Sequence, residues 1–325
     1  MFHKILIPLD TSPLAERVLH YLPQFARNKE VELLLVGAIE PSMYTYAMAS
    51  DEPLLISRLM EDIEQGFREY LAGIQDRLLN EGYRVSTHLL HGDAAQCISD
   101  VATREKCDLI AMTTHGRTGF SRWMLGSVAD RVIRTADQPI LLLRADLDLS
   151  APYVVNHILL PLDGSDLAEQ ALPLAQNVAR QTNADVLMLH VLQQLTFVDQ
   201  QLLDQTYLPS ESYENERMAN ARNYLAKMSD RLHMAQVHSS SEIVTGEPGK
   251  AILDRAAADK IDLIVMSSHG RSGYSRWAYG SIAAKVLHGA PCPLLLMRGI
   301  QKVRVEDAEV LKASAPVLDM QAEPA

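Results

Sequence analysis

Short apolar runs and amphipathic segments alternate along the whole chain. In the first half this pattern predicts strands at 4–9, 31–36, 83–90, 108–112 and 139–143, and helices from Ser12 to about 22, at 54–80, 94–106 and 126–135. The run at 31–36 is almost wholly apolar, which indicates a strand buried on both faces and hence a parallel sheet. Regular alternation of strand and helix is typical of a doubly wound α/β fold.

The second half repeats this order. Ile5–Asp10 recurs as Ile158–Asp163, and Gly92 recurs as Gly246, 154 positions later. A repeat of this length is too long for a solenoid unit and suits a duplicated domain. The predicted strands are 155–160, 184–192, 235–244, 262–266 and 293–297, and the predicted helices are 166–181, 211–232, 249–259 and 280–288. We therefore expect one domain at 1–146, a linker at 147–152, a second domain at 153–299, and a C-terminal tail at 300–325 that docks loosely or is disordered.

Residues with special backbone preferences mark the first helix. Ser12 is expected as its N-cap and Pro13 as its first residue, while Pro23 should kink or shorten it.

Composition narrows the classes of partner and compartment. A formal charge of −11 over 325 residues argues against a general nucleic-acid or anionic-membrane surface, since such partners select basic proteins. The three cysteines form no CxxC pair, which favours a reducing compartment without a disulfide framework. The apolar run at the N-terminus is too short for a signal peptide. The sequence also contains no run of 18 apolar residues, the length that a membrane-spanning helix needs. We expect a cytoplasmic protein.

One stretch is repeated far more closely than its surroundings. Residues 114–133 and 268–287 are identical at 11 of 20 positions. Each copy joins a predicted strand to a predicted helix, which is where parallel α/β sheets place ligands. We call residues 113–127 and 267–281 the marker loops.

The residues of the marker loops suit a bound anion. Glycines such as Gly116 and Gly126 permit positive φ and let backbone N–H groups approach a ligand, and Gly126–Ser127 opens a helix whose free N–H groups attract phosphate. Arg117 can add charge-assisted hydrogen bonds. An alternative is a tight connection without a ligand, in which Ser127 is the N-cap and Asp130 completes a capping box.

Other candidate residues are less specific. Asp10 and Asp163 end the first strand of each half, where a carboxylate could accept hydrogen bonds from a ribose hydroxyl or an adenine amine, or could simply compensate a helix N-terminus. His115 and His269 are isolated, so we expect no metal centre. The sequence lacks the Walker loop G-x-x-x-x-G-K-[ST], and no G-x-G-x-x-G follows the first strand.

With these motifs the chain resembles the universal stress protein family in its tandem, two-domain form. The family marker is G-x-x-G, nine residues, then G-[ST]. Gly116 with Gly126–Ser127 matches its last three positions, and so does Gly270 with Gly280–Ser281. The first glycine of the motif is replaced by Thr113 in one copy and Ser267 in the other.

The resemblance implies two five-stranded parallel sheets with strand order 3-2-1-4-5 and helices on both faces, paired through their fifth strands, with a possible further homodimer. It also implies ATP, with or without Mg²⁺, in each domain of a nucleotide-dependent stress-response regulator that acts on unidentified protein partners. The alternative is a nucleotide-free interaction scaffold. No water-activating group is evident, so no catalytic residue is expected, and at most slow ATP hydrolysis. The implied binding residues are Pro8, Leu9, Asp10, Ala38, Met112, Thr113, Gly116, Arg117, Gly126, Ser127 and Val128 in the first domain, and Pro161, Leu162, Asp163, Val191, Met266, Ser267, Gly270, Arg271, Gly280, Ser281 and Ile282 in the second.

Overall fold

The computed structural model describes residues 2–27, 29–41, 53–114, 125–144, 146–147, 149–194, 210–269 and 279–299. The first half contains β1 (Lys4–Pro8), α1 (Pro13–Glu16), the 3₁₀ helix η1 (Arg17–Tyr21), α2 (Leu22–Phe25), β2 (Glu32–Ile39), α4 (Pro53–Asn80), β3 (Arg84–His91), α5 (Ala94–Arg104), β4 (Leu109–Thr113), α6 (Ser127–Thr135) and β5 (Ile140–Leu143). The second half contains β6 (His157–Pro161), α7 (Asp166–Glu169), α8 (Ala171–Thr182), β7 (Asp185–Leu192), α10 (Ser210–Met234), β8 (Ser239–Thr245), α11 (Pro248–Ala258), β9 (Leu263–Ser267), α12 (Ser281–Gly289) and β10 (Leu294–Met297).

The described strands form one ten-stranded sheet in the order β3-β2-β1-β4-β5-β10-β9-β6-β7-β8. Pairing is parallel within each half and antiparallel only at the joint, where Leu141 of β5 faces Leu295 of β10. Each half thus has the order 3-2-1-4-5, which confirms the α/β fold expected from the resemblance. The halves meet through their fifth strands, also as expected.

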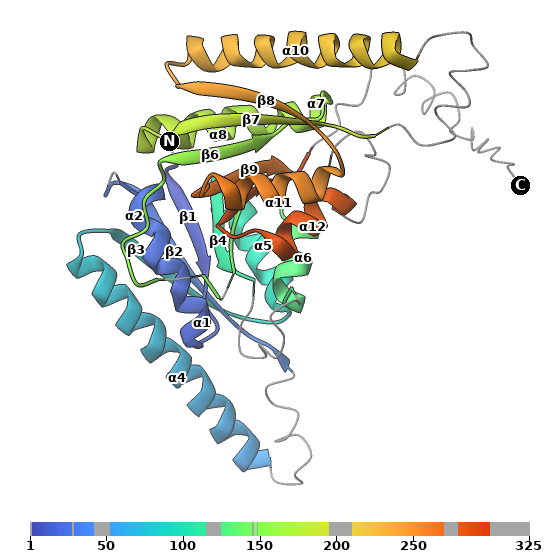
Figure 1. Cartoon of the computed structure of the whole chain (residues 1–325). Coiled ribbons are helices and arrows are strands. Elements are labelled where there is room, and N and C mark those ends of the chain that lie inside the picture. The colour runs from blue at the N-terminus through green and yellow to red at the C-terminus, as the bar shows by residue number, and fades with distance from the viewer. Residues whose placement is uncertain are drawn as a thin grey trace, which may run out of the picture.

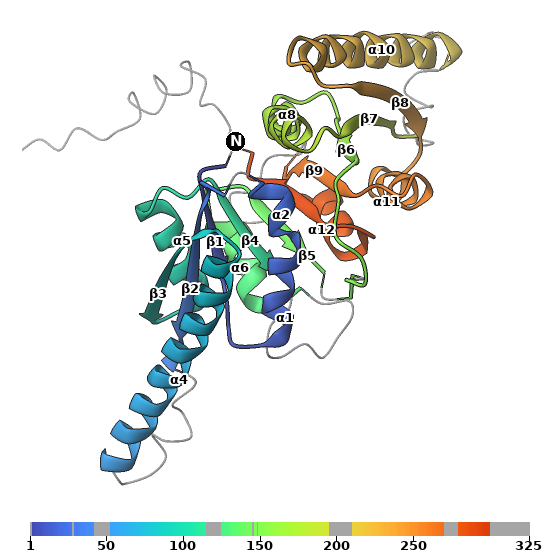
Figure 2. The ribbon, with the colours of Figure 1, turned by 90° about the vertical axis from the view of Figure 1, so that its left-hand side faces the viewer.

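Helices cover both faces of this sheet, as Figures 1 and 2 show. One buried cluster lies under α1, α2, α4, α8 and α10, and a second lies under α5, α6, α11 and α12. Each cluster includes residues of both halves. β4 and β9 are buried along their whole length, as expected for central strands of a doubly wound sheet.

Local signals in the sequence explain most helix starts. The Ser12 hydroxyl accepts from the N–H of Ala15, and Pro13 is the first helical residue, both as predicted. Pro23 stands in the first turn of α2, so the predicted single helix is divided into α1, η1 and α2. The strand predicted at 235–244 begins only at Ser239, because α10 continues to Met234 and Gln236 adopts a left-handed turn with φ of 58°.

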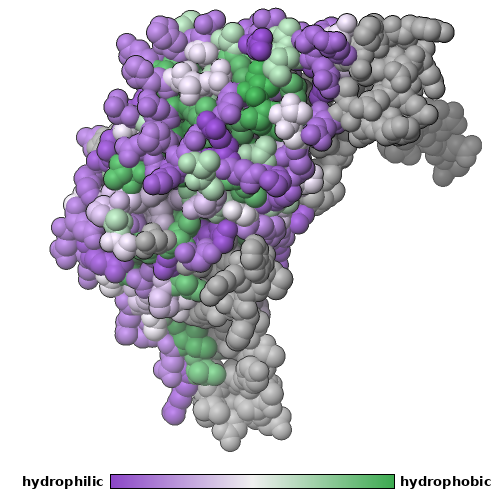
Figure 3. Space-filling model, in the orientation of Figure 1, coloured by the Kyte–Doolittle hydropathy of each residue, from purple (hydrophilic) through white to green (hydrophobic). Residues whose placement is uncertain are grey.

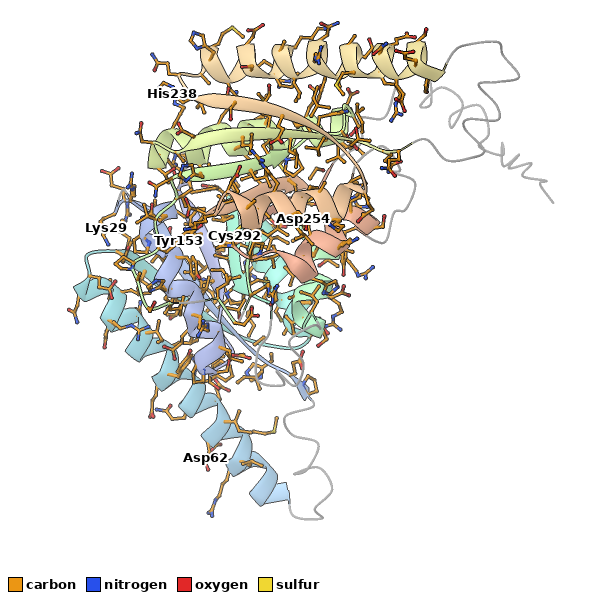
Figure 4. The ribbon with its side chains drawn as sticks, in the orientation of Figure 1. Lys29, Asp62, Tyr153, His238, Asp254 and Cys292 are labelled. Atoms are coloured by element: carbon orange, nitrogen blue, oxygen red, sulfur yellow. The ribbon has the colours of Figure 1, made fainter. Side chains whose placement is uncertain are left out.

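The two halves are also tied together by the segment that connects them. The Tyr153 hydroxyl donates to the carbonyl oxygen of Asp262 at 2.8 Å, and its ring lies 4.4 Å from the ring of Tyr21 in the first half. Burial raises the pKa of Tyr153 well above its usual value. Figure 4 shows Tyr153 near Cys292 at this junction. The connection is therefore packed between the halves. The tail at 300–325 lies outside the described residues.

Figure 3 shows that hydrophilic residues dominate the face seen in Figure 1. Apolar surface gathers beneath α10 and along the N-terminal half of α4. No helix in the described ranges is both long and apolar enough to cross a membrane.

Candidate nucleotide site

A pocket of about 860 Å³ opens at the carboxyl ends of β6, β7 and β9 in the second half. It lies at the edge where a doubly wound sheet binds ligands, next to the first strand of the domain. Nine of the eleven residues predicted for this half line it: Pro161, Leu162, Asp163, Val191, Met266, Ser267, Gly280, Ser281 and Ile282. The other two, Gly270 and Arg271, lie outside the described residues.

The N-terminus of α12 lines this pocket. Gly280 is the N-cap, and no described side chain caps the helix. In the same half, Ser165 caps α7 and Glu247 caps α11 with side-chain hydrogen bonds. The first N–H groups of α12 are therefore directed at the pocket without a side-chain acceptor, which is the arrangement that attracts a phosphate.

Two expectations about the starts of α6 and α12 are corrected by the structure. Ser127 is the first residue of α6 rather than its N-cap, which is Gly126, so Ser127 and Asp130 do not form a capping box. Gly126 and Gly280 both have φ of −62°, which any residue can adopt. Positive φ therefore does not explain these two glycines. A Cβ added at Gly280 would meet only the Ser268 carbonyl oxygen within 4 Å, at an ordinary 3.5 Å, so packing does not require glycine there either.

Asp163 lines the pocket and follows β6, which lies between β9 and β7 in the sheet. Its Oδ1 accepts from the N–H and the hydroxyl of Ser165, at 2.9 and 2.6 Å. Asp10 makes the same two hydrogen bonds with Ser12, at 3.0 and 2.6 Å. The carboxylate thus holds the turn into the next helix in both halves, and in the second half it also lines the pocket.

Several polar residues of the pocket were missed by reasoning from the sequence. Glu247 lines the wall beside α12, and the hydrogen bond from Lys285 is the main cause of its lowered pKa. That ion pair partly neutralises a carboxylate that would otherwise repel a phosphate. His269 is not isolated, because its Nδ1 lies 2.9 Å from the Ser268 hydroxyl. The pocket also takes a wall from α10, including Arg217 and Tyr224.

The serine that replaces the first motif glycine is buried at the end of β9. Ser267 is 6% exposed, and its hydroxyl accepts from the N–H of His269 at 3.5 Å. A Cβ added at Gly299 would come within 2.9 Å of this hydroxyl. The side chain therefore packs partly against its own domain.

The first half carries the same backbone arrangement. The Gly126 N–H donates to the Thr114 carbonyl at 2.7 Å, and the Gly280 N–H donates to the Ser268 carbonyl at 2.8 Å. The predicted residues Pro8, Leu9, Asp10, Ala38, Met112, Thr113, Gly126, Ser127 and Val128 lie at or just beyond the carboxyl ends of β1, β2 and β4, or at the start of α6. Gly116 and Arg117 fall outside the described residues, as do the loop arginines Arg122 and Arg276.

Fold and site together define a tandem α/β protein, with an open helix N-terminus after the fourth strand of each half. The sequence model of the universal stress protein family matches residues 1–144 and 155–298, so the chain belongs to this family.

Individual relatives agree with this assignment. Universal stress protein MJ0531 of Methanocaldococcus jannaschii is 32% identical over 144 residues, which are 44% of this chain and 83% of the relative. Universal stress protein Rv2623 of Mycobacterium tuberculosis is 23% identical over 301 residues, which are 90% of this chain and 96% of the relative. The crystal structure of a universal stress protein from Archaeoglobus fulgidus has a TM-score of 0.68 at 21% identity, covering 91% of this chain and 98% of that one. That likeness extends the match in fold to both halves.

Proposed function

We propose that this protein binds ATP at the carboxyl edge of each domain and acts in the stress response as a nucleotide-dependent regulator. The observation that carries the proposal is the second-domain pocket, which is lined by the N-terminus of α12, without a side-chain cap, and by Asp163. Phosphates would bind the first N–H groups of α12, and Asp163 would accept from a ribose hydroxyl. One solved universal stress protein is described as a complex with cAMP.

The pocket favours a ligand with both an anionic and an apolar part. Ser281 and the first N–H groups of α12 supply donors for an anion, while Leu162, Val191 and Met266 supply apolar surface in the same pocket. Binding sites of this size typically combine such apolar walls with a few polar groups that fix orientation. A Mg²⁺ ion would come with the phosphates of ATP rather than with a protein site. Within the described residues, no three His, Cys, Asp or Glu side chains form a group that could hold a metal.

Calorimetric titration of ATP into the full chain and into the double variant Gly126→Glu, Gly280→Glu tests the proposal. The backbone of both glycines suits any residue, and a Cβ at Gly280 would meet its nearest neighbour at an ordinary 3.5 Å. A carboxylate about 4 Å from a phosphate charge costs about 1–4 kcal/mol. ATP affinity should therefore fall at least about fivefold, with folding retained. The neutral variant Gly126→Gln, Gly280→Gln is the matched control and should bind better than the glutamate variant.

Equal ATP affinity in the wild-type chain and the glutamate variant would contradict the assignment of the site. The alternative function, a nucleotide-free scaffold, predicts no saturable ATP binding by either protein. Mass spectrometry of small molecules released from natively purified, denatured protein separates the two, because only the ATP-binding function predicts an adenine nucleotide.

A further inference from the structure

The two halves differ in the composition of one helix, which is α10 in the second half and α4 in the first. In the second half, the α10 side chains that line the pocket are Tyr213, Arg217, Asn220, Ala221 and Tyr224. Their spacing puts them on one face of the helix. Positions 154 residues earlier, on α4, carry Leu59, Ile63, Gly66, Phe67 and Tyr70. A largely polar face of α10 thus corresponds to a largely apolar set of positions on α4.

The correspondence is fixed by structure as well as by sequence. Tyr70 and Tyr224 occupy equivalent places, because Tyr70 lies beside Glu16 and Tyr224 lies beside Glu169, the matching residue of the second half. Four of the five paired positions nonetheless differ in chemistry.

One exchange changes the shape of the site. In the first half, Phe67 packs over Gly37 so closely that a Cβ there would lie 2.8 Å from its ring. In the second half, Ala221 stands in place of the phenylalanine. His190 stands in place of the glycine, because each is the sixth residue of its strand, β7 and β2. Both residues line the pocket. The larger side chain of the pair is therefore on the helix in the first half and on the strand in the second half. The small Ala221 leaves room in the pocket beside the other α10 side chains.

Arg217 holds a defined place in this wall. Its Nη2 donates to the carbonyl oxygen of Gln193 at 2.8 Å, and its guanidinium lies 5.8 Å from the ring centre of Tyr213. Gln193 directly follows β7. In the sheet, β6 separates β7 from β9, and α12 follows β9. Neighbouring strands are about 4.8 Å apart, so Arg217 is anchored about 10 Å across the sheet from the strand that leads to α12.

We propose that Arg217 recognises the base of the nucleotide in the second domain. The inference rests on the proposed function. A nucleotide with its phosphates on α12 and its ribose at Asp163 places its base against β7 and α10. A guanidinium there can stack on the aromatic face of a base and donate to its ring nitrogens. Ile63, its counterpart in the first domain, offers only apolar contact, so the two sites differ in how strongly they select the base.

The test compares a ligand with a base and a ligand without one. The parent is the full chain carrying Gly126→Glu, so that binding reports the second site. Calorimetry measures ATP and inorganic tripolyphosphate on this parent and on derivatives with Arg217→Ala or Arg217→Lys. Both derivatives should lose about tenfold in ATP affinity, since lysine keeps the charge but not the planar stacking group. Tripolyphosphate affinity should stay within about twofold.

Arg222→Ala is the matched control. Arg222 is an exposed arginine of the same helix and is not among the pocket-lining residues, so its loss should leave both affinities unchanged. Urea unfolding of each variant checks that the fold is retained.

The outcomes separate this inference from the function on which it rests. ATP binding that Arg217→Ala leaves unchanged overturns base recognition alone. Equal losses for ATP and tripolyphosphate also overturn it, because they would make Arg217 a phosphate ligand. A parent that binds neither ligand contradicts the proposed function, and the inference with it.

Discussion

Removal of the Tyr279 hydroxyl is expected to weaken the joint between the two domains. Tyr279 directly precedes the N-cap of α12, and its hydroxyl donates to Oδ1 of Asp130, on α6 of the first domain, at 2.9 Å. Arg134 donates to the same carboxylate through Nε at 2.9 Å and Nη2 at 3.1 Å. Its guanidinium also lies 5.1 Å from the centre of the Tyr279 ring. These three side chains link the helix that opens one candidate site to the helix that opens the other.

The magnitude follows from the chemistry and the exposure of this cluster. A hydrogen bond to a charged acceptor contributes about 1.5–3 kcal/mol when buried. The Asp130 side chain is 30% exposed, so solvent reduces the contribution to about 1 kcal/mol. Tyr279→Phe keeps the ring and its contact with Arg134 and removes only the hydroxyl. The free energy of unfolding should therefore fall by about 1 kcal/mol.

A double-mutant cycle with Tyr279→Phe and Asp130→Ala isolates this bond. Urea unfolding of the four proteins should give a coupling energy of about 1 kcal/mol between the two positions. Tyr83→Phe, which changes a tyrosine ring packed under Lys29 away from the joint, is a control that should not couple to Asp130→Ala. A coupling energy below about 0.3 kcal/mol for the Tyr279 pair would refute the reasoning.

The same cluster has a defined pH dependence. Burial acts to raise the pKa of Asp130, but hydrogen bonds from Arg134 and Tyr279 outweigh it, so the pKa lies below the ordinary value of 3.8. A lowered pKa in the folded state stabilises the protein above the unfolded-state pKa, and this contribution is lost as pH falls through the folded-state pKa. The difference between wild type and Tyr279→Phe should thus be constant from pH 7 to about 5 and should shrink below pH 3.8.

Two further predictions concern cysteine reactivity and helix capping. Burial raises the pKa of all three cysteines, to about 11 for Cys107 and about 12 for Cys292, and these two are also buried. A thiol reagent at pH 7.5 should therefore label native protein only at Cys97, the least buried of the three. Fast labelling of Cys292, read by mass spectrometry of peptides, would contradict the packing of the joint. Asp93→Ala should lower the free energy of unfolding by about 1 kcal/mol, because the Asp93 side chain caps α5 by accepting from the N–H of Gln96. An unchanged urea midpoint would contradict this role.

Much of the fold could be predicted from the sequence because its signals are local. Runs such as 31–36 are apolar at nearly every position, and only a strand covered on both faces needs that pattern. Ser12 and Pro13 mark a helix start by the chemistry of their own side chains. The repeat at a spacing of about 154 residues then indicates two copies of one fold.

The features that local signals could not predict depend on the path of the chain. The marker glycines suggested positive φ, yet Gly126 and Gly280 are extended N-caps, and only the neighbouring strand end fixes that geometry. Arg217 lies on a helix with the composition of a solvated surface. The position of α10 over β7 is what turns this residue toward the pocket. A comparison with Ile63, at the same place in the first repeat, is the signal that could have found it.

Contacts across the joint could also not be predicted from the sequence. Tyr279 and Asp130 are 149 positions apart, and their meeting depends on the antiparallel pairing of β5 and β10. Their counterparts in the other repeat are Ala284 and Leu125, which cannot form the same bond. The repeat therefore gives no hint of a polar contact at this place.

The most direct test of the account is a crystal structure of the full chain grown with a non-hydrolysable ATP analogue. It should show the phosphates on the backbone N–H groups at the start of α12, the ribose beside Asp163, and the base between β7 and Arg217. A second-domain pocket that stays empty at saturating analogue, or an analogue bound with its phosphates away from α12, would contradict the account.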